Sequence, residues 1–207
     1  MGLYSRYILP RLIDLVMRAP TETAERRQMI PRASGSVLEV GFGSGLNLSF
    51  YGRDVREIYG VDPSGELWRL GRRRLEGAKC PVHFVQASAE QIPLEDRRFD
   101  TVTMTWTLCS IRDPVRALTE IRRVLKPDGS VIFIEHGRSP DRGVQAWQAR
   151  LTPWWRRIAG GCHLDRAIDA LFATAGFHVD ELSTGYAGGP RPFSYLFKGI
   201  ARPGSRP

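Results

Sequence analysis

The sequence predicts a doubly wound α/β fold, with a mostly parallel seven-stranded sheet, an antiparallel last strand and a helical cap. Short apolar runs alternate along the chain with longer amphipathic segments. The run at 131–134 is continuously apolar, as expected of a strand buried on both faces of a parallel sheet. With 207 residues and 42% apolar content, the chain can bury one such core without disulfides or metal.

The expected elements follow in order from this alternation. Strands are expected at 36–41, 57–62, 82–87, 100–105, 130–135, 177–184 and 193–200. Helices are expected at 7–17, 45–51, 65–76 and 114–125, and a turn at 126–129 follows the last of them. The glycine-containing loop at 185–190 would let the last strand return antiparallel to its neighbours.

A glycine-rich segment lies where the first strand must give way to the next element. Residues 38–45 read L-E-V-G-F-G-S-G, with Glu39 ahead of three alternating glycines. Glycine tolerates positive φ and lets backbone approach a ligand closely. Asp62 ends the second expected strand about 20 residues later, where a carboxylate can accept both ribose hydroxyls of an adenosine. We therefore expect a nucleoside bound across two strand ends.

The spacing of the glycines separates two kinds of cofactor. A dinucleotide loop requires G-x-G-x-x-G, and Leu46 occupies the place next to Gly45 where that pattern fails. Glu39 would also repel a pyrophosphate. The ammonium and sulfonium of S-adenosylmethionine would be attracted to the same carboxylate, so the sequence favours S-adenosylmethionine.

The net charge of +8 comes almost wholly from arginine, because the chain has only three lysines. Clusters at 72–74 and 156–157 would attract nucleic acid or an anionic membrane surface. Their dispersal over several segments favours a solvated surface, so no specific nucleic-acid partner is expected. The amphipathic segment at 7–17 is expected to pack on the domain in preference to lying on a membrane.

Cysteine usage indicates a reducing environment. Cys80, Cys109 and Cys162 are scattered, with no C-x-x-C pair, which argues against a disulfide framework and against a zinc site. Cys162 and His163 are adjacent, but no third ligand is apparent beside them, so no metal is expected.

The first apolar stretch is too short and too interrupted for a bilayer span or a signal peptide. A cytoplasmic location is the expectation.

Five ordered motifs resemble those of class I S-adenosylmethionine-dependent methyltransferases, with a core of the ubiquinone and menaquinone type. The motifs lie at 39–45, 61–64, 87–94, 99–102 and 124–129. Shorter segments are similar to the animal methyltransferase-like thiol S-methyltransferases. These segments are 7–12, 107–111, 133–136 and 160–164.

The resemblance implies a domain division and a set of site residues. Residues 1–35 would be an amphipathic cap segment, 36–200 the cofactor-binding domain with a helical substrate cap at 136–165, and 201–207 a disordered tail. The cofactor would contact Glu39, Gly41, Phe42, Gly43, Gly45, Asn47, Asp62, Pro63, Ser88, Ala89 and Thr105. The family usually has aspartate where this chain has Ser88, so the adenine contact there departs from the pattern.

The acceptor side of the site comes from the segments outside the shared core. The candidates for the substrate pocket are Cys109, Ser110, Trp154, Cys162 and His163. His136, at the end of the fifth expected strand, is the candidate catalytic residue. The expected function is methyl transfer to a small molecule, with a thiol preferred. A quinone precursor or a phospholipid head group is an alternative acceptor, and a basic nucleic-acid-binding protein with a vestigial cofactor site is a non-enzymatic alternative.

Overall fold

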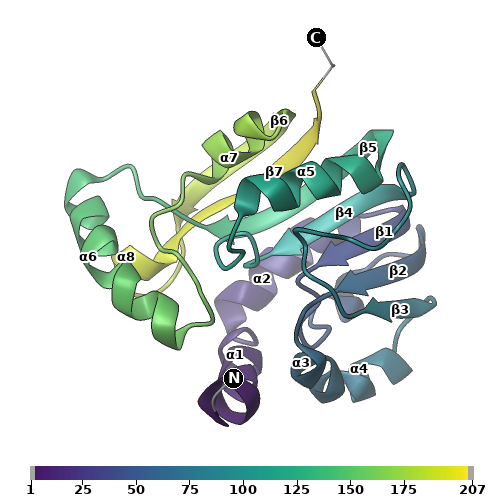
Figure 1. Cartoon of the computed structure of the whole chain (residues 1–207), viewed down its shortest axis with the longest axis horizontal. Coiled ribbons are helices and arrows are strands. Elements are labelled where there is room, and N and C mark those ends of the chain that lie inside the picture. The colour runs from purple at the N-terminus through teal and green to yellow at the C-terminus, as the bar shows by residue number, and fades with distance from the viewer. Residues whose placement is uncertain (1–2, 205–207) are drawn as a thin grey trace.

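A computed structural model describes residues 3–204 and has a seven-stranded sheet with helices on both faces (Figure 1). The strands are β1 (Gly35–Val40), β2 (Val55–Val61), β3 (Val82–Val85), β4 (Phe99–Thr105), β5 (Leu125–His136), β6 (Phe177–Tyr186) and β7 (Tyr195–Pro203). Their order in the sheet is β3-β2-β1-β4-β5-β7-β6. Strands β1 to β5 pair in parallel, and β7 runs antiparallel to both of its neighbours. The expected fold class is confirmed.

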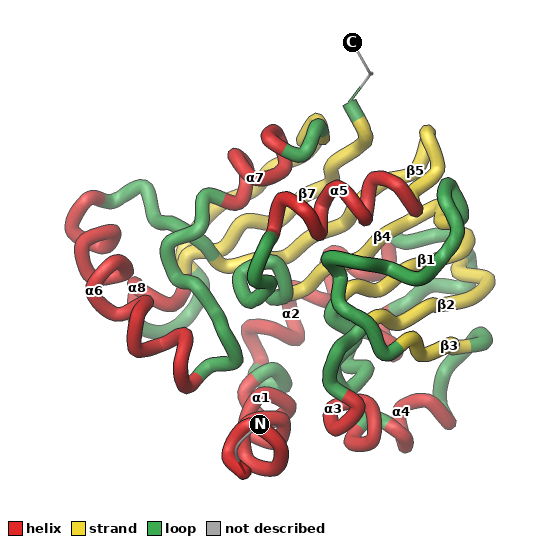
Figure 2. The backbone as a smooth tube through the Cα atoms, viewed as in Figure 1, coloured by secondary structure: helices red, strands yellow, loops and turns green. Residues whose placement is uncertain are grey.

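Helices cover both faces of the sheet, and the helices at 142–158 and 191–194 form a lobe beside it (Figure 2). The helices are α1 (Leu9–Val16), α2 (Pro20–Met29), α3 (Gly65–Leu70), α4 (Arg72–Glu76), α5 (Pro114–Val124), α6 (Arg142–Ile158), α7 (Ile168–Thr174) and α8 (Arg191–Ser194), with a π-helical turn η1 (Tyr4–Ile8) and 3-10 turns η2 (Ile30–Arg32) and η3 (Leu48–Phe50). Leu118 of α5 and Phe172 of α7 are buried in one core cluster, and Met29 of α2 is buried in the other. Burial on both faces is what the continuously apolar strand predicted.

The order of the strands creates a switch point between β1 and β4. From β1 the chain proceeds outward to β2 and β3, then crosses over to β4 on the other side of β1. Ligands of open parallel sheets bind outside the carboxyl ends of the strands at such a point. The segments that follow β1, β2, β4 and β5 therefore meet at one edge of the sheet.

Several expected elements differ from those observed. The helix expected at 45–51 is only the short turn η3, and the helix expected at 65–76 is divided into α3 and α4 at Gly71. A Cβ at Gly71 would lie 2.5 Å from the carbonyl oxygen of Ser44, so this helix approaches the glycine-rich loop at a point where only glycine fits. The turn expected at 126–129 falls within β5, as an irregularity in its pairing with β4.

Other differences concern the two ends of the chain. Helix α2 was not among the expected elements. Strand β7 continues through Pro203, three residues into the segment expected to be a disordered tail, because its pairing with β6 includes Phe177 opposite Pro203. The N–H of Gly204 donates to the Gly176 carbonyl, and the rest of that expectation falls on residues 205–207, which lie outside the described residues.

Helix α1 packs on the domain along one side and leaves the other side in contact with solvent. Pro10 and Asp14 are buried, whereas Leu12, Leu15 and Val16 are exposed. The segment therefore packs on the domain, as expected, through one side of α1 only. Among the described residues, 3–204, every helix is too short or too polar to cross a bilayer.

Candidate active site

The loop after β1 has the backbone conformation for which its glycines were singled out. Gly41, Gly43 and Gly45 have φ values of 74°, 57° and 72°. These values lie in the left-handed region that side chains disfavour. A Cβ at Gly41 would also overlap the Thr107 side chain at 2.1 Å, whereas a Cβ at Gly43 would meet only a carbonyl oxygen at 3.9 Å. The loop is therefore tightly packed at Gly41 and open at Gly43.

Asp62 joins this loop to the end of β2. Its carboxylate accepts hydrogen bonds from the backbone N–H of Gly43 at 2.8 Å and of Ser64 at 2.7 Å. Burial raises the pKa of Asp62, and the two backbone hydrogen bonds counter part of that effect. The acid predicted to hold the ribose is thus fixed beside the glycine loop. Pro63 follows it, and its carbonyl oxygen accepts a hydrogen bond from Gln86.

Glu39 lies beneath the loop and is buried. Its two carboxylate oxygens accept hydrogen bonds from the Asn47 amide and the Tyr51 hydroxyl, each at 2.9 Å. Burial raises the pKa of Glu39 to about 8 despite these bonds. The Asn47 amide also donates to the Thr105 hydroxyl at 3.1 Å. Three of the predicted cofactor residues therefore form one connected polar group.

Arg26 joins this group from α2, a contact that the sequence did not predict. Its Nε donates to Asn47 Oδ1 at 2.9 Å, and its Nη1 donates to the Met17 carbonyl at 2.7 Å. The guanidinium also lies over the Trp106 ring, 4.8 Å from its centroid. Burial lowers the pKa of Arg26 to about 10, so the group stays charged at neutral pH and faces the Glu39 carboxyl.

The remaining predicted cofactor residues have mixed placements. Phe42 is buried, with its ring centroid 5.3 Å from that of Trp68. Ala89 is buried, whereas the Ser88 hydroxyl donates to Glu90 Oε2 at 2.8 Å and accepts from the Glu90 N–H. In this arrangement Ser88 stabilises its own turn.

The structure brings together three of the predicted acceptor-side residues that are distant in sequence. Nε2 of His136 lies 2.9 Å from Sγ of Cys162, and that sulfur lies 3.8 Å from Sγ of Cys109. Both cysteines are buried. Hydrogen bonds from Cys109 and His136 lower the pKa of the Cys162 thiol, and the same contact raises that of His136 although burial opposes it.

Glu135 positions the loop that carries Cys109, and it too was not predicted. The buried carboxylate accepts backbone hydrogen bonds from Thr107 at 2.8 Å, Leu108 at 2.9 Å and Cys109 at 3.3 Å. Burial raises the pKa of Glu135 to about 7. The signal in the sequence is a carboxylate that directly continues an apolar strand and precedes His136, because a charged side chain in that position needs partners.

The other three acceptor candidates do not join the cysteines and His136 equally. The Ser110 hydroxyl lies 3.6 Å from the Cys109 sulfur. The backbone N–H of His163 donates to the Cys109 carbonyl at 2.8 Å, while its ring lies 3.8 Å from Asp165. Trp154 is 68% exposed, with Arg157 stacked over its ring. Trp154 is therefore a surface residue of α6 and does not line this buried cluster.

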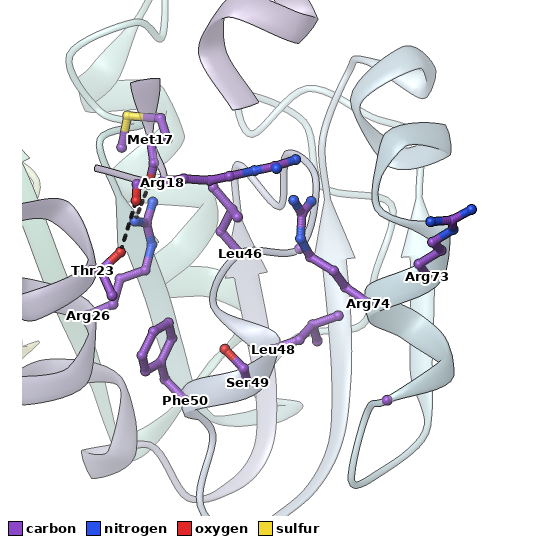
Figure 3. A pocket seen from close by; sticks show the side chains of 12 residues that line it. Met17, Arg18, Thr23, Arg26, Leu46, Leu48, Ser49, Phe50, Arg73 and Arg74 are labelled. Carbon is purple, nitrogen blue, oxygen red and sulfur yellow. Dashed lines mark hydrogen bonds between the residues drawn. The ribbon is translucent and has the colours of Figure 1, made fainter. Parts of the chain in front are cut away.

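A separate cavity lies on the outer side of the glycine loop (Figure 3). Its volume is about 370 Å³, and Gly45 is the only predicted cofactor residue among those that line it. Arg18, Arg26, Arg73 and Arg74 are among the residues that line it. The cavity is bounded by the residues that follow α1, by α2 and by α4. It is therefore distinct from the nucleoside position predicted between Asp62 and Glu39.

Comparison with known proteins agrees with the fold. A family model described as a methyltransferase domain matches residues 38–133. The chain is 38% identical to the thiol S-methyltransferase TMT1B of Rattus norvegicus over 166 residues, which cover 78% of this chain and 66% of the rat protein. For TMT1B of Mus musculus the identity is 37%, with 79% of this chain and 67% of the relative covered.

Two further matches cover a larger share of the other protein's length. Phosphatidylethanolamine N-methyltransferase of Cereibacter sphaeroides is 29% identical, with 86% of this chain and 88% of the relative covered. The crystal structure of a SAM-dependent methyltransferase from Aquifex aeolicus superimposes with a TM-score of 0.64 at 19% identity, covering 94% of this chain and 98% of that one. The latter similarity concerns the fold alone.

The order of the strands and the switch point define an α/β enzyme of the Rossmann-like type. The chain belongs to the S-adenosylmethionine-dependent methyltransferases, and S-adenosylmethionine is its cofactor. This membership is at odds with the alternative of a non-enzymatic nucleic-acid-binding protein. The matched part spans just under two thirds of the rat relative.

Proposed function

We propose that this protein transfers the methyl group of S-adenosylmethionine to the sulfur of a small thiol. The observation that carries the proposal is that the glycine loop expected to hold the cofactor lies against the segment that leads to the cluster of Cys109, His136 and Cys162. The backbone of Gly41 lies against Thr107, and the same loop continues through Cys109 to the contact with Cys162 and His136. The glycine loop and the sulfur-rich cluster are thus adjacent at one edge of the sheet.

We assign the cofactor to the first half of the site. Glu39 and the loop from Gly41 to Gly45 would hold the methionine end, with Asn47 and Thr105 in the polar group around Glu39. Asp62 would accept the ribose hydroxyls, with Phe42 and Pro63 beside it. The backbone around Ser88 and Ala89 would contact the adenine, since the Ser88 hydroxyl is already used in its turn.

A thiol is the acceptor that requires least from this site. Methyl transfer from a sulfonium is an in-line displacement in which the enzyme mainly aligns the reactants and excludes water. A thiol ionises near neutrality, and its thiolate is already a strong nucleophile. We place His136, Cys109, Ser110, Cys162 and His163 on the acceptor side. The names of the rat and mouse relatives support a thiol.

The test is a competitive screen with methyl-labelled S-adenosylmethionine and a panel of small thiols, quinols, amines and phospholipids. We expect label on sulfur for at least one thiol, with an Asp62→Ala variant less active than the parent at a limiting cofactor concentration. Label only on carbon, nitrogen or lipid in the parent protein would contradict the proposal. An exposed substitution, Glu95→Gln, serves as the matched control for loss of a carboxylate.

A second candidate acceptor is a phospholipid head group, favoured by a specific feature of the cap. Leu12, Leu15 and Val16 on α1 are exposed, and the arginine-lined cavity lies beside the end of that helix. An apolar helix face suits the surface of a bilayer, and guanidinium groups suit a phosphate. Methylation of ethanolamine lipids in vesicles, lost in a Leu12→Ser/Leu15→Ser variant that still methylates a soluble acceptor, would favour this candidate over a free thiol.

A further inference from the structure

Two sulfurs and one imidazole converge on the acceptor side of the site from three separate segments. Cys109 follows β4, His136 ends β5, and Cys162 follows α6. Their ligand atoms all lie within 4.8 Å of one another. The expectation of no metal depended on the lack of a third ligand beside Cys162 and His163, and the fold supplies two ligands from elsewhere in the chain.

We propose that Cys109, His136 and Cys162 bind a thiophilic divalent cation, Zn²⁺, through two thiolates and one imidazole, and that the fourth position takes the acceptor thiol. Binding of the metal depends on the three donors alone, whereas the use of the fourth position rests on the proposed function. Three protein ligands and one open position are the usual arrangement of a catalytic zinc.

The distance between the two sulfurs suits a tetrahedral ion, and the imidazole lies close enough to reach the same ion after a small shift. Two thiolates bound to Zn²⁺ at about 2.3 Å lie about 3.8 Å apart, and the sulfurs of Cys109 and Cys162 are 3.8 Å apart. An imidazole nitrogen and a thiolate on the same ion lie about 3.5 Å apart, and Nε2 of His136 is 2.9 Å from the Cys162 sulfur. One of the two groups has to move outward by about 0.6 Å to admit the ion.

The three donor segments are held together by hydrogen bonds that do not involve the donor atoms. The Glu135 carboxylate fixes the backbone of Thr107, Leu108 and Cys109. The backbone N–H of His163 donates to the Cys109 carbonyl, which ties the Cys162 segment to the same loop. Arg166 donates to the carbonyls of Leu108 and Ile111. The site is therefore positioned before any ion binds, as a specific metal site requires.

The chemistry of the donors selects the ion. Thiolate and imidazole prefer zinc and other soft or borderline ions over Mg²⁺ or Ca²⁺, which take oxygen ligands. Two thiolates also neutralise a divalent charge, so the occupied site adds no net charge to a buried position. Nδ1 of His136 is buried and makes no hydrogen bond within residues 3–204, so Nε2 is the nitrogen that faces a polar group.

The bound ion would activate the acceptor in a defined way. A thiol that enters the fourth position releases its proton to solvent and becomes a metal-bound thiolate. Its sulfur lone pair then forms the new S–CH₃ bond, while the bond between that methyl group and the cofactor sulfonium breaks. The electron pair of the broken bond stays on the sulfur of S-adenosylhomocysteine, and the sulfonium charge is lost.

The test measures metal binding directly on the full chain. Protein freed of metal is titrated with Zn²⁺ alone, and separately with Co²⁺, whose visible bands and thiolate charge-transfer band report a tetrahedral sulfur site. We expect roughly one ion per chain in the parent. Cys109→Ser and Cys162→Ser should each weaken binding by more than roughly 100-fold. Cys80→Ser, which alters the half-buried cysteine outside the cluster, should bind like the parent.

The parent protein provides a second measurement in case a cysteine variant does not fold. Addition of 2-mercaptoethanol to the Co²⁺ form should intensify the charge-transfer band, because a third sulfur enters the coordination sphere. A parent that binds no Zn²⁺, or that binds it equally after both cysteines are replaced, overturns the proposal. So does a Cys109–Cys162 disulfide in freshly prepared active protein. Metal-free turnover of a thiol refutes the metal role alone, whereas metal binding without thiol turnover refutes the proposed acceptor alone.

Discussion

Asp14 in α1 accepts a hydrogen bond from the hydroxyl of Ser44 in the glycine loop at 2.5 Å. The same carboxylate pairs with Arg18 and, at 3.0 Å, with Arg74, whose guanidinium also donates to the Ser44 carbonyl. The cap helix is therefore connected to the loop that would hold the methionine end of the cofactor. Movement of α1 and order in that loop should be coupled.

Replacement of Asp14 by Asn tests this coupling. The variant keeps the shape of the side chain but loses its charge, so its interaction with Arg74 and Arg18 weakens. We expect the affinity for S-adenosylhomocysteine to fall by about 1 kcal/mol, the scale of one hydrogen bond, when it is measured by calorimetry. Asp180→Asn, on the far edge strand β6, removes one carboxylate without this effect. Unchanged affinity in Asp14→Asn would show that the cap does not order the loop.

Asp14 also gives the protein a defined response to acid. Burial acts to raise the pKa of Asp14, but hydrogen bonds from Ser44 and Arg74 and the charges of Arg74 and Arg18 lower it overall. A carboxyl whose pKa is lower in the folded state stabilises the fold above its unfolded pKa and loses that contribution as pH falls through the folded value. The parent should therefore lose more stability below pH about 4 than Asp14→Asn does, as followed by chemical denaturation.

The glycine loop allows a comparison between two residues of the same kind. Gly41→Ala should reduce the melting temperature, because its Cβ would overlap the Thr107 side chain at 2.1 Å and its φ is positive. Gly43→Ala meets only the φ penalty, about 1–2 kcal/mol, and should fold. We expect Gly43→Ala to lose cofactor affinity through the methyl group that projects into the open side of the loop. A Gly43→Ala variant with parental affinity would place the cofactor elsewhere.

The sequence predicted the sheet and the backbone conformation of the glycine loop because both depend on local pattern. Continuous apolar runs predict buried parallel strands, and alternating glycines predict a loop with positive φ, which Gly41, Gly43 and Gly45 have. The helix expected at 45–51 is reduced to the turn η3, and the Asn47 side chain that precedes this turn donates to Glu39 and Thr105. Such contacts with the ends of β1 and β4 have no signature in helical periodicity.

The acceptor half was predicted as residues but not as an arrangement. Cys109, His136 and Cys162 were named separately, and their convergence depends on loops whose paths are set by Glu135 and Arg166. Trp154 was expected in the pocket, but it faces solvent on α6. Helix periodicity is weak where a helix carries three tryptophans and a proline, so it could not specify which face is buried.

Cofactor binding should be linked to release of a proton from Glu39. Burial raises the pKa of Glu39 to about 8, so the carboxyl is largely protonated at pH 7. A methionine ammonium beside it would favour the ionised form, and binding would then release a proton. Affinity for S-adenosylhomocysteine should therefore increase as pH rises from 7 to about 9. Calorimetry in buffers of different ionisation enthalpy measures the number of protons released.

Glu39→Gln provides the control for that linkage. The amide keeps a hydrogen-bond partner for Asn47 but cannot ionise, so both the proton release and the pH dependence should disappear. The same raised pKa makes Glu39 a destabilising residue at high pH, since the folded state then holds a buried carboxylate. The free energy of unfolding of the parent should fall between pH 4.5 and about 8 relative to that of Glu39→Gln. Equal pH profiles for the two proteins would contradict the assignment.

Asp62→Ala should weaken cofactor binding by about 1–3 kcal/mol, the scale of a lost hydrogen bond to a charged group. The substitution also removes the acceptor for the N–H groups of Gly43 and Ser64. Asp62→Asn keeps part of that acceptor capacity and should lose less affinity. Calorimetry with adenosine separates the two effects, because adenosine has the ribose but lacks the methionine end. Unchanged adenosine affinity in Asp62→Ala would show that Asp62 does not bind the ribose.

His136→Ala should reduce turnover more than it reduces cofactor affinity, because Nε2 of His136 faces the Cys162 sulfur on the acceptor side of the site. The glycine loop and Asp62 make no hydrogen bond to His136, so the dissociation constant for S-adenosylhomocysteine should change by less than about twofold. Turnover with the thiol acceptor should fall by roughly 10²-fold or more. His178→Ala, in which an exposed histidine of β6 is removed, should leave both quantities unchanged. If His136→Ala lowers turnover and cofactor affinity in equal proportion, His136 supports the cofactor site from a distance. If it lowers neither, the acceptor binds away from Cys109 and Cys162, because a thiol held by those residues cannot avoid the imidazole that lies 2.9 Å from one of them.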